Sequence, residues 1–152
     1  MSEIDPPATI ELLTFRLADQ EYSLDIMSVR EIRGWTRTTP LPHAPKFMKG
    51  VINLRGTVLP VMDLGERLGL EPRQQTDRNV IIVVKHENTM TGLLVDAVSD
   101  IITLTSADLQ PPPEMNSSAM PNVVSALTLI DDRMIRVLDL AATVQVPEAV
   151  AV

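Results

Sequence analysis

The sequence predicts an all-β protein made of two similar small units, arranged as a sandwich or as small barrels. Short apolar segments rich in β-branched residues alternate with turn signals along the chain. Long stretches with the 3.6-residue period of a helix are scarce. Segments of the first half recur in the second half, which indicates an internal duplication.

Seven segments have the composition of strands, and turn residues separate them. They are LLTFRL (12–17), VINL (51–54), TVLPVM (57–62), NVIIVVK (79–85), TGLLVDAV (91–98), NVVSALTLI (122–130) and RMIRVLDL (133–140).

Helical signals are brief. Ile26, Val29 and Ile32 are spaced three apart after Asp25, which predicts a turn or two of helix with Asp25 as its cap. The segment 63–68 predicts a second short helix, although Gly65 weakens it.

Two proline-rich stretches separate these segments. Residues 38–46 contain three prolines and are expected to run extended, because proline fixes φ and removes a donor. Residues 110–121 contain four prolines and are expected to form an exposed loop. We expect tails at 1–10 and 143–152 around one domain of residues 11–142.

Two alignments define the repeat. Residues 15–32 align without gaps on residues 84–101, so that Ile32 matches Ile101, an offset of 69. Residues 51–64 align on residues 127–140, and both end in Asp-Leu. Units of this size are marginally stable alone, so we expect the halves, about 11–70 and 79–142, to pack on each other and to leave a groove between them.

Composition excludes several classes of function. The formal net charge of −7 disfavours binding to nucleic-acid phosphates. The absence of cysteine removes disulfides and thiolate chemistry and favours the cytoplasm. The opening residues lack a signal-peptide pattern, and no apolar run is long enough to insert into a membrane.

Few residues are suited to catalysis or to metal binding. His43 and His86 lie far apart in the chain, and no phosphate-binding or nucleophile motif occurs. The recurring aspartates are expected to cap turns rather than to bind metal. They are Asp25, Asp63, Asp96, Asp100 and Asp139. We therefore predict no enzyme activity, no cofactor and no metal.

Arg55 lies between two apolar runs in GVINLRGTVLPVMDL (50–64). The runs predict a hairpin in which Gly56 supplies a positive φ. The repeat places Asp131-Asp132 at the equivalent turn, so the fold does not require an arginine there. Pro60 predicts an edge or a bulge for the second strand. Glu31 is a candidate partner, but the sequence does not decide whether the two side chains meet.

Three motifs together resemble the CheW-like domain family of chemotaxis adaptors. They are VREIRG (29–34), KGVINLRGTVLPVMDL (49–64) and GLLVDAVSDI (92–101), and they occur in the order of the family. The resemblance covers about residues 11–142. It implies two five-stranded SH3-like β-barrels packed together around a shared core, with a few short helices.

The resemblance also implies a function. Members of the family are non-catalytic adaptors that couple the cytoplasmic tips of chemoreceptors to the regulatory domain of the histidine kinase CheA, in arrays close to the membrane. A small-ligand sensor or a minor enzyme that uses the groove is the alternative. The short remainder after residue 140 leaves the extent of the usual terminal helix open.

The resemblance assigns roles to individual positions. Glu31 and Arg55 match an acidic and basic pair that influences receptor coupling, and Gly34 and Gly50 match positions linked to kinase contact. The walls of the receptor-binding groove would be Leu13, Ile26, Val29, Ile32 and Val98. The alternative for these five residues is an ordinary place in the core.

Overall fold

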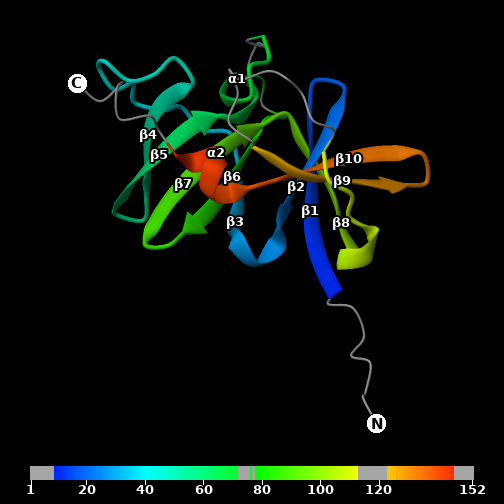
Figure 1. Cartoon of the computed structure of the whole chain (residues 1–152). Coiled ribbons are helices and arrows are strands. Elements are labelled where there is room, and N and C mark those ends of the chain that lie inside the picture. The colour runs from blue at the N-terminus through cyan, green and yellow to red at the C-terminus, as the bar shows by residue number, and fades with distance from the viewer. Residues whose placement is uncertain (1–8, 72–75, 77, 113–122, 146–152) are drawn as a thin grey trace.

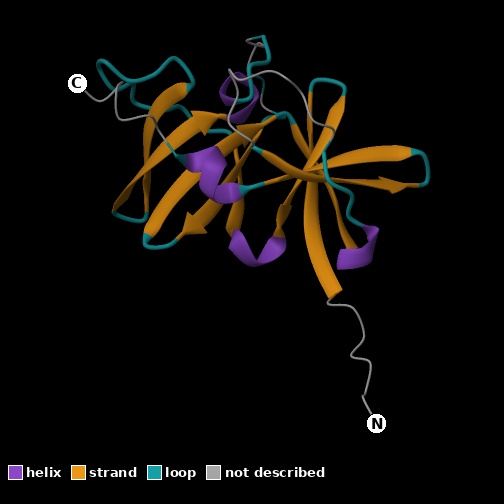
Figure 2. Cartoon of the chain, viewed as in Figure 1, coloured by secondary structure: helices purple, strands orange, loops and turns teal. Residues whose placement is uncertain are grey.

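The computed structural model of the protein describes residues 9–71, 76, 78–112 and 123–145. Strands dominate, and they form two five-stranded sheets that lie side by side (Figures 1 and 2). Sheet A has the order β8-β1-β2-β10-β9 and contains β1 (Thr9–Leu17), β2 (Gln20–Asp25), β8 (Ala97–Thr105), β9 (Val124–Ile130) and β10 (Arg133–Leu138). Sheet B has the order β3-β6-β7-β5-β4 and contains β3 (Val29–Gly34), β4 (Met48–Leu54), β5 (Thr57–Asp63), β6 (Val80–His86) and β7 (Thr89–Val95).

Each sheet combines strands from both halves of the chain. Sheet A takes β1 and β2 from the first half and β8, β9 and β10 from the second, whereas sheet B takes β3, β4 and β5 from the first half and β6 and β7 from the second. β3 follows β2 in the chain but pairs with β6 in sheet B, and β8 follows β7 but pairs with β1 in sheet A. The predicted mostly β fold with two five-stranded units is confirmed. The sheets, however, do not divide the chain into 11–70 and 79–142, because each sheet takes strands from both halves.

The internal repeat is visible in the backbone. The turns after β1 and β6 carry Ala18 and Glu87 with φ of 56° at equivalent positions. The hairpin turns after β4 and β9 also correspond, with positive φ at Arg55-Gly56 and at Asp131-Asp132. This pattern is the one expected for two-residue hairpin turns.

Each of the edge strands β3 and β8 contains a β-bulge where it pairs with a strand of the other half. In β3 the register shifts between Val29 and Glu31, and Val29 and Ile32 face Val84 and Ile82. The extra residue therefore brings two side chains spaced three apart to one face of a strand. The predicted turn of helix capped by Asp25 is present as η1 (Ile26–Ser28), whereas Val29 and Ile32 lie in β3, where the bulge gives them a helix-like spacing.

The helical segments are short, and aspartates cap three of them. Asp25 caps η1, Asp63 caps α1 (Leu64–Arg67) and Asp139 caps α2 (Leu140–Val144), each by accepting a backbone N–H bond. A further 3₁₀ turn, η2 (Ser106–Asp108), follows β8. The capping prediction was wrong for Asp100, which lies inside β8.

Pro60 lies in an interior strand, contrary to the predicted edge. β5 is paired with β4 along its length, and its parallel pairing with β7 begins only at Val61. Proline is tolerated because the part of β5 before Val61 pairs only with β4, so the backbone of Pro60 need not donate a hydrogen bond to β7. The bulge lies in the neighbouring strand, between Met48 and Gly50.

The proline-rich stretches leave the sheet edges at equivalent places. Thr39 forms an isolated bridge with Val51 on β4, and Gln110 forms one with Leu127 on β9. A proline follows each bridging residue, so pairing with the edge strand stops there. Residues 38–46 are not fully extended, because a turn occurs around His43 (φ 60°). Most of the predicted 110–121 loop lies outside the described residues.

Three apolar clusters form the core. The largest lies between the sheets and takes side chains from both, among them Phe15 on β1 and Val84 on β6. The second fills the inner face of sheet B and the third the inner face of sheet A. β1 and β6 are therefore buried on both faces, and the η1 turn packs against both strands.

Candidate functional site

The hairpin turn after β4 places Arg55 against β3. The Arg55 Nη2 atom donates to Glu31 Oε1 at 2.5 Å. Asn53 accepts the Gly56 N–H at 2.7 Å and stabilises the turn that carries Arg55. Because β3 and β4 are the two edge strands of sheet B, this contact connects the opposite edges of one sheet.

The pair is accessible to solvent. The Arg55 side chain is 69% exposed and that of Glu31 is 27% exposed. The hydrogen bond from Arg55 lowers the pKa of Glu31, and the Glu31 carboxylate in turn raises the pKa of Arg55. Arg33 also lies near Glu31, at 3.5 Å. An exposed guanidinium held by one carboxylate can still offer its other donors to a partner.

The apolar residues predicted for the groove fall into two groups. Leu13 is 1% exposed and lies in the core between the sheets, so the core alternative holds for it. Ile26, Val29 and Val98 are half-buried and pack against that same core, and Ile32 is 47% exposed. The structure thus places four of the five at the rim of the central core.

Sequence reasoning missed two exposed residues at this rim. Ile101 on β8 pairs with Leu13 and is exposed, as is Met27 in η1. Ile101 could have been found, because the repeat aligns it with Ile32. We name the set Ile26, Met27, Val29, Ile32, Val98 and Ile101 the apolar rim.

The two glycines differ. A Cβ at Gly50 would lie 2.1 Å from the carbonyl oxygen of Thr39, and Gly50 has a φ of 135°. Internal packing against Thr39 therefore suffices to require glycine at this position. A Cβ at Gly34 would meet nothing within 4 Å, so the surface there is open.

The described residues contain no group of three metal-ligating side chains. Within that part of the chain, no helix is long and apolar enough to cross a membrane. An exposed ion pair and an apolar rim are features of a surface that binds other macromolecules.

The chain was compared with known proteins. The model of the CheW-like domain family matches residues 11–148. The chain is 52% identical over 132 residues to a probable chemotaxis protein CheW of Rhizobium etli, covering 87% of this chain and 85% of that protein. It is 49% identical over 130 residues to the chemotaxis protein CheW of Rhizobium meliloti, covering 86% and 84%.

A solved structure shares the fold. The crystal structure of the scaffolding protein TtCheW from Thermoanaerobacter tengcongensis superposes with a TM-score of 0.82 at 33% identity, covering 91% of this chain and 94% of that one. The family match, these relatives and the shared fold define the class of protein, which is a non-catalytic scaffolding module of chemotaxis. The chain belongs to the CheW-like domain family.

Proposed function

We propose that the protein couples the cytoplasmic tips of chemoreceptors to the regulatory domain of the histidine kinase CheA, in arrays on the cytoplasmic side of the membrane. The main support for this proposal is that Glu31 and Ile32 are adjacent residues on β3. One strand presents both an ion pair that reaches the opposite sheet edge and an exposed apolar side chain of the rim.

The apolar rim is suited to a helical receptor tip. Its most exposed members are Met27, Ile32 and Ile101, which lie in η1, β3 and β8. A helix docks on such a surface with apolar side chains spaced three and four apart. The half-buried rim residues Ile26, Val29 and Val98 would form the base of that contact.

The kinase contact is assigned to the sheet B edges. Gly34 ends β3 with open space around its Cα, so a partner backbone can approach closely. Gly50 would support kinase binding indirectly. Because it has no side chain, the segment 38–40 can pack on β4 and shape this edge of sheet B. Arg55 contacts Glu31, which lies on the edge strand β3 beside the apolar rim, and we assign to this pair the coupling of receptor to kinase.

Binding measurements with purified components test this function. A soluble receptor cytoplasmic fragment and the CheA regulatory domain should each bind the protein at micromolar concentrations. Ile32→Asp should weaken receptor binding while leaving kinase binding intact. Leu129→Asp, at a similarly exposed apolar position on β9, is the matched control. Failure of the wild-type protein to bind either partner would overturn the proposal.

A further inference from the structure

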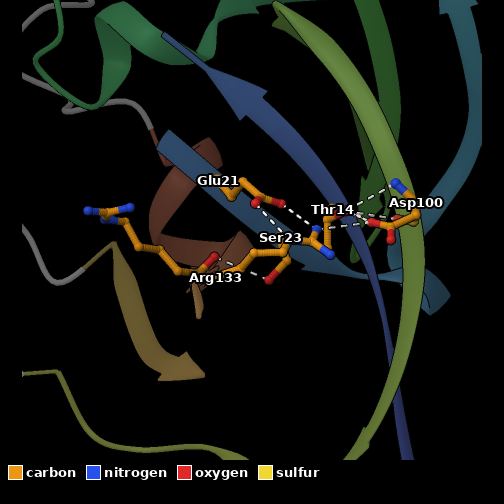
Figure 3. Close-up of polar contacts among 6 residues, drawn as sticks. Thr14, Glu21, Ser23, Asp100 and Arg133 are labelled. Carbon is orange, nitrogen blue, oxygen red and sulfur yellow. Dashed lines mark hydrogen bonds and ion pairs between the residues drawn. The ribbon is translucent and has the colours of Figure 1, made fainter. Parts of the chain in front are cut away.

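Sheet A contains a polar network in place of part of its inner core. Arg133, Glu21, Thr14 and Asp100 come from the four neighbouring strands β10, β2, β1 and β8 (Figure 3). We call these four residues the sheet A clamp. It connects β10 with the edge strand β8 across the two strands that lie between them.

The contacts of the clamp are well defined. Arg133 donates from Nε to Glu21 Oε1 at 2.9 Å and from Nη2 to Glu21 Oε2 at 2.6 Å. The same Nη2 atom lies 3.4 Å from Asp100 Oδ1. A two-point arginine–carboxylate pair fixes geometry more strictly than a single contact.

Thr14 links the clamp to the bulge in β8. The register between β1 and β8 shifts between Leu13 and Phe15, so Thr14 faces the bulge. Its hydroxyl accepts the Asp100 backbone N–H at 3.1 Å and lies within hydrogen-bond distance of the Asp100 carboxylate. These contacts stabilise β8 where its ladder with β1 is interrupted.

The clamp holds two carboxylates and one guanidinium, and its contacts favour the charged form of each. The hydrogen bond from Arg133 lowers the pKa of Glu21, and that from Thr14 lowers the pKa of Asp100. Glu21 in turn raises the pKa of Arg133. All three groups remain charged at neutral pH.

Sheet B shows that the fold does not require this network. The repeat aligns Thr14, Glu21 and Arg133 with Val83, Met90 and Thr57. Among the described residues, the inner cluster of sheet B correspondingly has seven buried apolar residues, whereas that of sheet A has four. A partly buried ion pair seldom stabilises a protein more than well-packed apolar residues in the same place. The clamp is therefore better explained by a role in positioning its strands than by a contribution to stability.

The repeat also relates the clamp to the ion pair of sheet B. Asp100 aligns with Glu31, and each carboxylate meets an arginine from the hairpin of its own sheet. The two arginines differ in exposure, 35% for Arg133 and 69% for Arg55, whereas the Asp100 side chain, at 49%, is more exposed than that of Glu31, at 27%. What distinguishes the sheet A arginine is its second carboxylate partner, Glu21, which holds the guanidinium in place.

We infer that Arg133 is a positioning residue for receptor binding: through Asp100 and Thr14 it fixes the edge strand β8, which carries Val98 and Ile101 of the apolar rim. The inference rests on the proposed receptor contact. Both rim residues flank the bulge that the clamp stabilises, with Val98 facing Phe15 and Ile101 facing Leu13. A displaced bulge would move these two side chains away from their half-buried and exposed positions.

The test replaces three clamp residues by the residues that the repeat places at the equivalent positions of sheet B. In Thr14→Val/Glu21→Met/Arg133→Thr, amide exchange in residues 97–105 should accelerate about tenfold, because β8 opens locally without global unfolding. Affinity for a receptor cytoplasmic fragment should fall about tenfold. Arg136→Ala is the control, since Arg136 lies on β10 and stacks on Tyr22 outside the clamp.

Two single variants support the test. Arg133→Lys should retain part of the affinity, and Asp100→Asn should repeat both effects of the triple variant in weaker form. If the triple variant does not fold, Asp100→Asn decides by the same two measurements. Unchanged exchange in β8, or loosened β8 with unchanged receptor affinity, would overturn the inference. If even the wild-type protein fails to bind the receptor fragment, the proposed function fails, and the positioning role fails with it.

Discussion

Arg55 and Glu31 meet across sheet B, at 2.5 Å between Nη2 and Oε1. The contact connects the turn after one edge strand, β4, with the other edge strand, β3. Nothing in the hairpin itself requires this arginine, because the equivalent turn of sheet A is formed by Asp131 and Asp132. The hairpin turn of sheet B therefore carries an arginine that forms an ion pair, whereas the corresponding turn of sheet A carries two aspartates.

Removal of this ion pair should leave the fold intact. Arg55→Ala is expected to leave the free energy of unfolding close to the wild-type value, because exposed salt bridges contribute little. Urea denaturation of Arg55→Ala, Glu31→Gln and the double variant measures the pair in a double-mutant cycle. A clear loss of stability in the single variants, with a large coupling in the cycle, would show instead that the pair holds the sheet edges together.

The two glycines should respond differently to the same substitution. Gly50→Ala is expected to destabilise the protein by about 1–3 kcal/mol, since the added Cβ would collide with the Thr39 carbonyl at an unfavourable φ. Gly34→Ala, the matched control, should be near neutral in thermal unfolding. Equal melting temperatures for the two variants would contradict the assigned packing of residues 38–40 on β4.

These glycines and the ion pair show what the sequence could and could not predict. The hairpins and the aspartate caps were predictable, because Arg55-Gly56 and Asp63 are local signals. The pairing of β3 with β6 was not, because a bulge places Val29 and Ile32 on one face with the spacing of a helix. The sheet A clamp joins residues up to 112 positions apart, and no local pattern reports such a contact.

Arg67 should hold the terminal helix α2 in place. Its guanidinium donates to the carbonyl oxygens of Ala142 at 2.8 Å and Thr143 at 3.1 Å, and it lies over the ring of Phe47. Arg67→Ala is expected to cost about 1–3 kcal/mol, because two of the last helix carbonyls lose their donor. Hydrogen exchange should accelerate in residues 140–145.

Arg78→Ala, an exposed arginine before β6, serves as the control for that variant. If Arg67→Ala and Arg78→Ala have the same stability and the same exchange in residues 140–145, Arg67 does not hold α2.

Stability should fall in acid through the clamp carboxylates. Glu21 and Asp100 have pKa values below their ordinary 4.5 and 3.8 in the folded protein, so the unfolded chain binds protons more readily. Their contribution is complete above the unfolded values and is lost as the pH falls through the folded ones. Glu21→Gln should therefore lose less stability than the wild-type protein between about pH 5 and pH 3.

Urea denaturation at a series of pH values measures this effect. Glu11→Gln, at an exposed glutamate on β1, is the control and should follow the wild-type curve. An identical acid slope for Glu21→Gln and the wild-type protein would mean that the Glu21–Arg133 pair contributes nothing in solution.

Kinase activity in an assembly reconstituted from receptor fragment, CheA and this protein tests the coupling role most directly. The proposed role predicts that Arg55→Glu and Glu31→Arg, each folded and each binding both partners, reduce receptor-dependent kinase activation at least about tenfold, because like charges then face each other across sheet B. The charge-exchanged double variant should recover much of the activation, since it restores the ion pair across sheet B. Wild-type activation by either single variant would contradict the assignment of coupling to Arg55 and Glu31.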